Sequence, residues 1–343
     1  MRHLFVVDPP ASFDIWADTT IAFMREAARR GQGVFACEVA QLHIDASGRP
    51  VADFVELRLA GPDYWNRVDA VVAAAVSGDA PAAGRAVGNP WYTAAGAGRG
   101  ALSEFDVVWM RKDPPYDLDY FFATHLLSLV PPPALVTNDP SALREVTEKL
   151  YVLRFPELTP RTLVSRSQAE LLAFREKLGG EMVIKPLDGC GGEGVFHLTR
   201  EDRNAHAILE MATAHGTRYQ IAQAYVPEVR RGDKRIVLVE GEPVGAVLRV
   251  PRATESRSNF HVGGSAAKTE ISAREREICA RIGPDLRARG IVFAGIDVIG
   301  DWLIEVNVTS PTGVREINAL DGVRIEGQVL DAVVRRRESQ RGE

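Results

Sequence analysis

The chain has 343 residues, 45% of them hydrophobic and 25% charged, and its formal net charge at pH 7 is −5. This length predicts two or three domains with ample hydrophobic core. The acidic balance excludes a general nucleic-acid binder, although it leaves room for local basic pockets. The three cysteines, Cys37, Cys190 and Cys279, are far apart and fit no zinc-binding spacing, which indicates a reducing, cytoplasmic environment. No segment has the apolar length of a membrane span, so we expect no membrane partner.

The first part of the chain alternates predicted strands and helices. Residues 3–7 predict a strand, the stretch from Asp18 to Gly31 predicts a helix with a signal at each end, and "GVFACEV" and "FDVVWMRKDPP" predict two more strands. This alternation is typical of a parallel sheet, in which ligands bind at the carboxyl ends of the strands. Asp8, Arg111 and Lys112 fall at such ends, and we expect the two cations to pair with substrate carboxylates.

Residues 79–101 are rich in alanine and glycine. They show no clear periodicity of apolar side chains. The segment therefore predicts a flexible surface insertion away from any functional site.

The second part of the chain changes from helix to strand. "SALREVTEKLYVLRF" predicts a helix and "MVIKP" a strand. "YQIAQAYV" predicts another strand, and "RIVLVEGEPVGAVLRV" predicts a hairpin that turns at Gly-Glu-Pro. The last helix ends in "VVRRRESQRGE", which predicts a solvated, frayed tail.

The stretch "IDVIGDWLIEVN", residues 296–307, places three oxygen-bearing side chains inside two apolar runs. Glu305 and Asn307 share one face of a strand because side chains alternate. Asp297 joins that face if the turn is centred on Asp301, whereas a two-residue Gly-Asp turn sends Asp297 to the other face. If the three side chains converge, they form an all-oxygen cluster suited to Mg²⁺. The alternative is one wet face of an edge hairpin.

The stretch "VIKPLDGCGGEGV", residues 183–195, has a lysine on a strand followed by a glycine-rich loop. Glycines let backbone N–H groups converge on an anion, although an ordinary mobile hairpin loop has the same composition. The order of residues fits neither a Walker loop nor a Rossmann fingerprint. Four basic residues recur along the chain: Lys149, Lys185, Arg235 and Arg249. Together with the oxygen cluster and the glycine-rich loop, they predict a nucleoside triphosphate bound with Mg²⁺.

Several long motifs resemble those of the bacterial glutathione synthetases, which are ligases of the ATP-grasp superfamily. They are "MRKDPP", "EKL", "KPLDGCGGEGVF", "HGTRYQIAQAYVP", "GDKRIVLVEGEPV" and "GIDVIGDWLIEVNVTSPTGVREI", in this order over nearly the whole chain. The resemblance implies an α/β (α+β) ATP-grasp fold in three parts. These are an N-terminal Rossmann-like parallel-sheet domain over residues 1–140, a small lid subdomain over 141–222 and a C-terminal antiparallel-sheet catalytic domain over 223–343.

The resemblance also implies roles for individual residues. ATP would be bound by two lysines, the glycine loop and the hinge strand: Lys149, Lys185, Gly189, Gly191, Gly192, Gly194, Gln223, Ala224, Tyr225, Val226 and Asp233. The ion Mg²⁺ or Mn²⁺ would be held by Asp297, Glu305 and Asn307. The implied catalytic residues are Arg235, Arg249 and Arg257. The implied substrate contacts are Asp8, Arg111, Lys112, Asn259, Gly263, Gly264 and Ser310.

The segment 250–268, "VPRATESRSNFHVGGSAAK", resembles the family's mobile lid over the acyl-phosphate site. It departs from the family pattern in "GGSAAK", where an arginine is expected soon after the glycines. Lys268 or Arg257 would have to take the place of that arginine.

The implied reaction is the ATP-dependent formation of a peptide bond between γ-glutamylcysteine and glycine, through an acyl phosphate. The implied partners are small molecules, and the family suggests a homo-oligomer, either a dimer or a tetramer. Two alternatives stay open. One is another carboxylate–amine ligase of this fold with a different acceptor, and the other is a non-catalytic nucleotide sensor, against which the intact oxygen triad argues.

Overall fold

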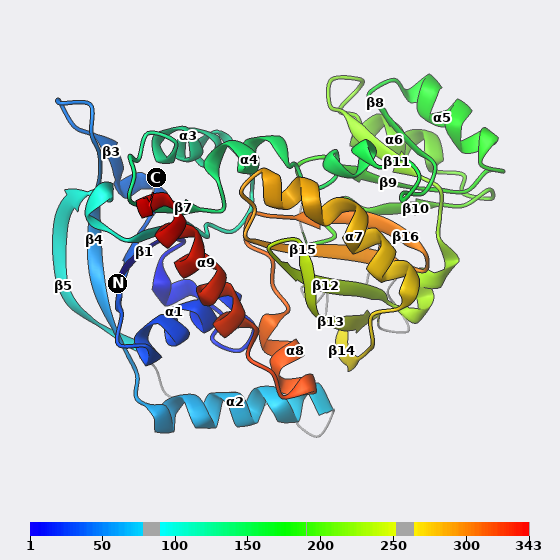
Figure 1. Cartoon of the computed structure of the whole chain (residues 1–343). Coiled ribbons are helices and arrows are strands. Elements are labelled where there is room, and N and C mark those ends of the chain that lie inside the picture. Colours follow the sequence, from blue (N-terminus) through cyan, green and yellow to red (C-terminus); the bar gives the residue numbers. More distant parts are fainter. Residues whose placement is uncertain (78–89, 190, 252–263, 343) are drawn as a thin grey trace.

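Figure 1 shows the computed structural model, which describes residues 1–77, 90–189, 191–251 and 264–342. The described strands form three sheets, and the first has the order β3-β4-β2-β1-β6-β7 with β5 paired to β4. Its parallel strands are β1 (Arg2–Val6), β2 (Gly33–Cys37), β6 (Val107–Met110) and β7 (Leu135–Thr137). Its antiparallel strands are β3 (Leu42–Ile44), β4 (Pro50–Leu59) and β5 (Tyr92–Ala101). The four parallel strands confirm the sheet type predicted for this part of the chain.

Helix α1 (Thr19–Arg29) lies where the sequence predicts a helix. The carboxylate of Asp18 caps it by accepting hydrogen bonds from the backbone N–H groups of Thr20 and Ile21, at 2.6 and 3.2 Å. Gly31 follows its end with a φ of +69°, a conformation that glycine adopts without strain. The predicted cap and stop signals are both confirmed.

Strand β5 corrects the prediction of a flexible insertion over residues 79–101. Residues 78–89 lie outside the described part, but β5 (Tyr92–Ala101) pairs along the whole length of β4. Backbone hydrogen bonds hold this strand, and its small side chains are mostly exposed. The prediction was wrong for the strand because alanine and glycine give no alternation of apolar and polar residues from which to recognise one.

The helix predicted from "SALREVTEKLYVLRF" is shorter than expected. Helix α4 (Pro140–Glu145) ends after six residues, and a 3-10 turn follows at η5 (Tyr151–Arg154). Between them the carbonyl of Glu148 accepts a hydrogen bond from the backbone N–H of Val306 at 3.0 Å. This pairing with a distant strand replaces the bonds that a continuing helix would make.

The second sheet is antiparallel throughout and has the order β10-β9-β11-β8. Its strands are β8 (Thr162–Ser165), β9 (Met182–Pro186), β10 (Phe196–Leu198) and β11 (Gln220–Gln223), and its helices are α5 (Gln168–Lys177) and α6 (Ala205–Ala212). The unit has a small hydrophobic core of its own, which includes Leu171, Met182, Ile184, Leu198 and Leu209.

The third sheet is also antiparallel, with the order β14-β13-β12-β15-β16. Its strands are β12 (Asp233–Val239), β13 (Glu242–Val250), β14 (Ser265–Lys268), β15 (Phe293–Ile299) and β16 (Trp302–Asn307). The predicted hairpin is confirmed between β12 and β13, although its turn is Glu240-Gly241 rather than Gly-Glu-Pro, since Val239 pairs with Glu242. Helix α7 (Ala273–Ala288) packs on this sheet, and α8 (Val314–Asp321) follows β16 and meets α2 (Pro62–Ser77).

The last helix, α9 (Ile325–Gly342), returns to the first sheet. Figure 1 shows it beside α1 and β7. It also contacts β12 of the third sheet. Its residues Val329 and Leu330 are fully buried in the same hydrophobic cluster as Phe23 of α1. The C-terminal helix therefore covers part of the core of the N-terminal sheet.

Part of the predicted solvated, frayed tail is instead held against the rest of the chain, at Arg336 and Arg337, whereas residues 338–340 are exposed as predicted. Arg336 donates a hydrogen bond to Glu240 at 2.6 Å, and buried Arg337 pairs with Asp106. The prediction was wrong for these two arginines because their partners lie far away in sequence.

The domain boundaries after residues 140 and 222 stay a prediction, although the three sheets follow one another along the chain in that order. Helix α3 (Leu118–Leu127) lies beside α4 at the side of the first sheet. None of the helices in the described part of the chain is both long and apolar enough to cross a membrane.

Candidate active site

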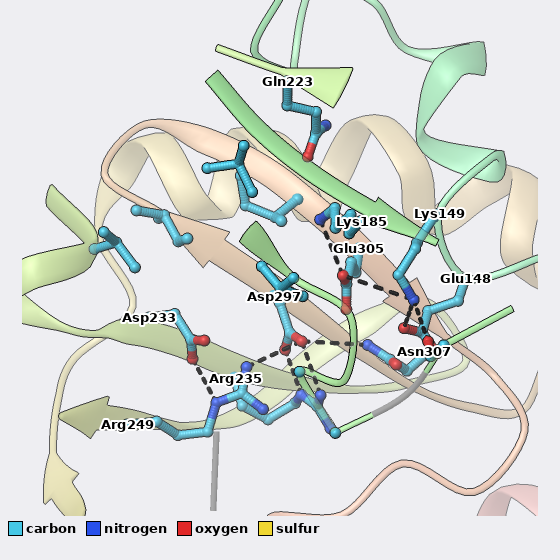
Figure 2. Close-up of a pocket in the computed structure, with 18 of the residues that line it drawn as sticks. Glu148, Lys149, Lys185, Gln223, Asp233, Arg235, Arg249, Asp297, Glu305 and Asn307 are labelled. Atoms are coloured by element: carbon cyan, nitrogen blue, oxygen red, sulfur yellow. Dashed lines mark hydrogen bonds and ion pairs between the residues drawn. The ribbon is translucent and has the colours of Figure 1, made fainter. Parts of the chain in front are cut away.

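A cavity of about 390 Å³ lies between the second and third sheets. Its walls come from β9 and β11 on one side and from β12, β13, β15 and β16 on the other (Figure 2). Most of the residues predicted to bind nucleotide and metal line it, together with two predicted catalytic arginines and one predicted substrate contact: Lys149, Lys185, Gly189, Gly191, Gly192, Gln223, Ala224, Tyr225, Val226, Asp233, Arg235, Arg249, Asp297, Glu305, Asn307 and Ser310. The structure thus brings these distant motifs together in one place.

The other predicted residues are not part of this wall. Asp8 and Lys112 form an ion pair of 3.0 Å at the ends of β1 and β6, and Arg111, Gly194 and Gly264 are described but do not line the cavity. Arg257, Asn259 and Gly263, predicted in the lid, lie outside the described residues.

The oxygen cluster depends on a β-bulge in β16. The turn between the strands is the two-residue Gly-Asp turn, since Ile299 pairs with Trp302. Simple alternation would then send Asp297 to the far face, and that part of our expectation was wrong. Ile304 is an extra residue in β16, so that Asp297 pairs with Glu305 after all. The bulge places both carboxylates on the face that lines the cavity.

Two arginines neutralise Asp297. Arg235 donates to its two oxygens from Nε and Nη2 at 2.5 and 2.9 Å, and Nη2 of Arg249 approaches it at 3.0 Å. Arg249 also pairs with Asp233 (Figure 2). Burial alone would raise the pKa of Asp297, but the two guanidinium groups outweigh it and hold that pKa well below its ordinary value. Asp297 is therefore ionised.

Two lysines neutralise the carboxylate of Glu305. Nζ of Lys185 lies 3.0 Å from a Glu305 oxygen and Nζ of Lys149 lies 4.0 Å from it. Burial opposes ionisation, yet the lysines lower the pKa of Glu305 to about 2. The cavity thus holds the ionised carboxylates of Asp297 and Glu305, the carboxylate of Asp233 that pairs with Arg249, and four buried cations. The cations make it a suitable environment for a polyanion bound together with a metal ion.

Glu148 is a cavity residue that the sequence analysis did not single out, although it stands in the quoted motif "EKL". Its carboxylate accepts a hydrogen bond from Lys149 at 2.6 Å. Burial, followed by the charge of Glu305, raises the pKa of Glu148 to about 7. The motif itself was the available signal, because it places an acid directly beside a predicted phosphate-binding lysine.

The predicted metal ligands fit a hard cation in their chemistry. Asp297 and Glu305 supply carboxylate oxygens, and Asn307 is within reach, with its amide nitrogen 3.4 Å from an Asp297 oxygen. The described residues contain no group of three or more His, Cys, Asp or Glu that could hold a metal ion. Two carboxylates and one amide agree with Mg²⁺ chemistry, in which phosphate oxygens and water complete the coordination.

The glycine loop after β9 requires its glycines. Gly191, Gly192 and Gly194 have φ values of +61°, +81° and +69°, which other residues rarely adopt. A Cβ atom on Gly189 would come within 2.6 Å of the ring of Pro186. The carbonyl of Gly189 also accepts a hydrogen bond from Nζ of Lys149 at 2.6 Å. This hydrogen bond holds the glycine loop beside Lys149 in the same wall of the cavity.

Strand β11 ends at Gln223, short of the predicted strand end at Val226, and the hinge segment that follows it brings an aromatic pair into the cavity. The ring of Tyr225 stacks on His197, with centroids 3.9 Å apart and planes at 13°. Nε2 of His197 lies 2.8 Å from a Glu181 oxygen. The sequence analysis missed His197 because only the pairing of β10 with β9 brings it close to the hinge.

Arg111 lies behind the cavity wall rather than in it. Its guanidinium donates to Oγ1 of Thr20 at 3.2 Å and to the carbonyls of Thr309 and Pro311 at 3.3 and 3.4 Å. The loop that contains Thr309 and Pro311 follows β16 and lines the cavity. Arg111 thus connects α1 to this loop, and its predicted contact with a substrate carboxylate gains no support from the arrangement.

Solved structures share the fold of this chain. D-cycloserine synthetase DcsG superposes with a TM-score of 0.62 at 16% identity, covering 98% of this chain and 99% of the other. A structure of the ATP-grasp ligase PsnB with a minimal precursor, Mg and ADP gives a TM-score of 0.58 at 15% identity, with 98% of each chain covered. The fold of this chain is therefore that of the ATP-grasp ligases.

Sequence comparisons are more specific. The glutathione synthetase of Gloeobacter violaceus is 46% identical over 97% of both chains. That of Brucella melitensis is 44% identical over 96% of this chain and 97% of its own. Residues 1–144 match the family described as prokaryotic glutathione synthetase, N-terminal domain, and residues 148–322 match its ATP-grasp domain. The chain therefore belongs to the prokaryotic glutathione synthetase family.

Proposed function

We propose that this chain is an ATP-dependent carbon–nitrogen ligase that joins γ-glutamylcysteine to glycine and releases ADP and phosphate. The observation that carries the proposal is the cavity between the second and third sheets, where two ionised carboxylates and four cations from distant motifs meet. Identity of more than 40% over nearly the whole chain to curated glutathione synthetases supports the choice of substrates.

In this proposal the nucleotide lies against the second sheet. Lys149 and Lys185 would bind its phosphates, the loop from Gly189 to Gly194 would cover them, and the hinge over residues 223–226 would offer backbone groups to the adenine. The carboxylate of Asp233 and the guanidinium groups of Arg235 and Arg249 complete the opposite wall. The lysines are suited to this role because both are buried. Lys185 would exchange Glu305 for a phosphate oxygen, and Lys149, which donates to Glu148 and to the carbonyl of Gly189, lies beside the glycine loop.

Asp297, Glu305 and Asn307 would hold Mg²⁺ or Mn²⁺. When bound, the ion would offset charge on the phosphates and orient them for transfer. Arg235 and Arg249 keep Asp297 ionised and in place, so that its oxygens are ready for the cation. These two arginines also neutralise negative charge that develops during phosphoryl transfer.

The chemistry requires no protein nucleophile. The C-terminal carboxylate of the dipeptide attacks the γ-phosphorus of ATP, which forms an acyl phosphate and releases ADP. The amine of glycine then attacks the acyl carbon and loses a proton, and phosphate leaves. The contribution of the protein is to position the reactants and to stabilise charge. Water must be kept out because it would hydrolyse the acyl phosphate, which is the proposed purpose of the lid predicted over residues 250–268. Residues 252–263 of that range lie outside the described part, and Ser265–Lys268 form β14 of the third sheet, so the prediction was wrong for these last residues.

The test is ADP and phosphate release with γ-glutamylcysteine and glycine, compared with the same assay on other dipeptide and amine pairs. Turnover that requires both expected substrates supports the proposal. Turnover with a different acceptor alone would identify another ligase of this fold, and nucleotide binding without any turnover would identify a sensor.

The proposal extends to the state of the protein in the cell. Its small-molecule substrates, its net charge of −5 and its three separated cysteines support a cytoplasmic enzyme that uses neither nucleic acid nor membrane. The family resemblance supports a homo-oligomer, a dimer or a tetramer. We also propose the division into an N-terminal domain, a lid subdomain and a catalytic domain at residues 140 and 222.

A further inference from the structure

Gln223 marks an uncharged end of the cavity. It pairs with Val183 across β11 and β9, and both side chains line the cavity together with Val226. Lys185 lies two residues further along β9, about 7 Å from Val183 at the usual rise of a strand. The part of the cavity beside Gln223 is therefore suited to a neutral, flat group such as a nucleoside base, next to the cations that suit its phosphates.

A chain of two hydrogen bonds fixes the side-chain amide of Gln223. Oγ1 of Thr162 lies 2.7 Å from the carbonyl oxygen of Pro160. A carbonyl can only accept, so this bond uses the single hydroxyl hydrogen of Thr162. The hydroxyl oxygen then accepts from Nε2 of Gln223 at 3.1 Å. If the amide were turned round, two acceptors would face each other, so the bond to Pro160 determines which end of the amide faces Thr162.

The oxygen of the Gln223 amide is left for the cavity. Figure 2 shows this side chain reaching from β11 into the space between the sheets, with its oxygen directed towards the third sheet. Gln223 is only 3% exposed, so the amide is confined by its neighbours. Among the residues that the structure describes, its side chain forms one hydrogen bond, through the nitrogen. The cavity is thus lined at this point by a hydrogen-bond acceptor.

We propose that Thr162 sets the base selectivity of the nucleotide site, because it holds the oxygen of Gln223 towards the base. This inference rests on the proposed binding of a nucleotide in the cavity. An acceptor at this position attracts the 6-amino group of adenine and repels the 6-carbonyl group of guanine or hypoxanthine. Thr162 does not line the cavity itself, so it is a positioning residue that acts through Gln223.

Removing the hydroxyl of Thr162 separates selectivity from stability. In Thr162→Val a methyl group of similar size replaces the hydroxyl and forms no hydrogen bond. The two orientations of the Gln223 amide then become similar in free energy, and the amide can present its nitrogen to a 6-carbonyl group. Damage to the fold would weaken the binding of every nucleotide alike, whereas a released amide weakens the binding of ATP and strengthens that of ITP.

The experiment measures the dissociation constants of ATP and ITP by calorimetric titration of the full chain, with Mg²⁺ and without dipeptide or glycine. ITP has the sugar and phosphates of ATP but a carbonyl group at position 6. Wild type is expected to bind ATP about 10²-fold more tightly than ITP. This ratio is expected to fall by at least about 10-fold in Thr162→Val and to stay near the wild-type value in Thr162→Ser, which keeps the hydroxyl.

The matched control is Thr217→Val in the same unit of the chain. The hydroxyl of Thr217 also donates to a nearby carbonyl, that of Ala214 at 2.7 Å, but Thr217 is exposed and lies outside the cavity wall. Its removal is expected to leave both dissociation constants unchanged. Thr162→Ala removes the same hydroxyl without the second methyl group and is expected to lower the ratio as Thr162→Val does, so the test survives if the valine variant does not fold.

Three results would overturn the inference: equal affinity of wild type for the two nucleotides, an unchanged ratio in both Thr162→Val and Thr162→Ala, or an equal loss of the ratio in Thr162→Ser. The proposed function is judged separately, by ligation of γ-glutamylcysteine and glycine. Ligation with no preference for ATP over ITP would contradict the role of Thr162 alone. A wild type that binds neither nucleotide would contradict both the role of Thr162 and the proposed function.

Discussion

Asp297 and Glu305 face each other across β15 and β16 although the strands are joined by a turn of only two residues. The extra residue at Ile304 restores the pairing that this turn would otherwise destroy. Each carboxylate is then matched by its own pair of cations, arginines for Asp297 and lysines for Glu305. One local irregularity in a strand therefore determines whether the candidate metal site can exist.

Glu305→Gln tests the metal site. The amide keeps the size of the side chain but removes the charge that would attract Mg²⁺, so kcat is expected to fall by about 10²–10³-fold. Circular dichroism should show an intact fold. The control is Glu277→Gln on α7, an exposed partner of Arg274, which should leave turnover unchanged. Near-normal turnover of Glu305→Gln at limiting Mg²⁺ would contradict the assignment.

Arg111→Leu tests whether Arg111 positions the loop after β16. The change leaves the half-buried carbonyl of Thr309 and the buried carbonyl of Pro311 without this donor, and we expect the free energy of unfolding to fall by about 2–4 kcal/mol. Urea denaturation without substrate measures this. Lys112→Leu, which removes a partly exposed ion pair with Asp8 and an exposed hydrogen bond to the Asp113 carbonyl, should change it by less than about 1 kcal/mol. An unchanged unfolding curve for Arg111→Leu, with a raised KM for the dipeptide, would instead indicate a direct substrate contact.

Asn138→Ala tests the connection between the first and third sheets. The Asn138 amide donates to the carbonyls of Phe293 and Val308, at 2.8 Å each, and its oxygen accepts from the N–H groups of Val292 and Phe293. Removing these buried bonds is expected to destabilise the chain by about 3 kcal/mol.

The control for Asn138 is Asn204→Ala, since Asn204 is exposed and its side chain does not cap α6. Thermal unfolding should shift clearly for Asn138→Ala and hardly at all for Asn204→Ala. Equal shifts for the two variants would show that the Asn138 bonds contribute nothing specific.

Glu26 gives the stability a dependence on pH. Hydrogen bonds from Arg29, opposed by burial and reinforced by Arg30 and Arg324, lower the pKa of Glu26 from 4.5 to about 2. The stabilisation is fully present above the unfolded pKa of 4.5 and is lost as pH falls toward about 2. Because Arg29 and Arg324 are more than half exposed, we expect only about 2 kcal/mol at pH 7.

The measurement for Glu26 is urea unfolding of wild type and Glu26→Gln between pH 7 and pH 3. The difference between them should be largest at neutral pH and should shrink below pH 4.5. The exposed substitution Glu201→Gln should show a small difference at every pH. A Glu26→Gln difference that grows on acidification would have the wrong sign for this account.

The sequence predicted those elements whose signals are local. Asp18 and Gly31 mark the ends of α1, and contiguous motifs contain the two lysines and the glycine loop. The register of β15 and β16 was left with two alternatives, and neither was the observed one, because a bulge breaks the strict alternation on which both were built. Local signals therefore predict which elements form better than how they are aligned.

Contacts between distant segments account for the rest. Strand β5 consists largely of alanine and glycine, so its sequence lacks the alternation of apolar and polar residues from which a strand paired with β4 could have been predicted. The helix before Lys149 ends early because Val306 bonds to Glu148 instead. Arg111 was expected to meet substrate because it lies at a strand end, but tertiary packing gives it two carbonyls of a loop about 200 residues further along. Such partners have no signature in one sequence.

The return of α9 to the first sheet has a consequence for biosynthesis. A ribosome delivers the N-terminal strands long before it releases the final turns that cover Phe23 and its neighbours. Until α9 has been synthesised, that side of the nascent protein has to be shielded by a chaperone or remain only partly consolidated. A fragment cut after residue 144 would retain the same bare surface, so expressing it alone should yield aggregates unless a peptide corresponding to residues 325–342 is supplied in trans.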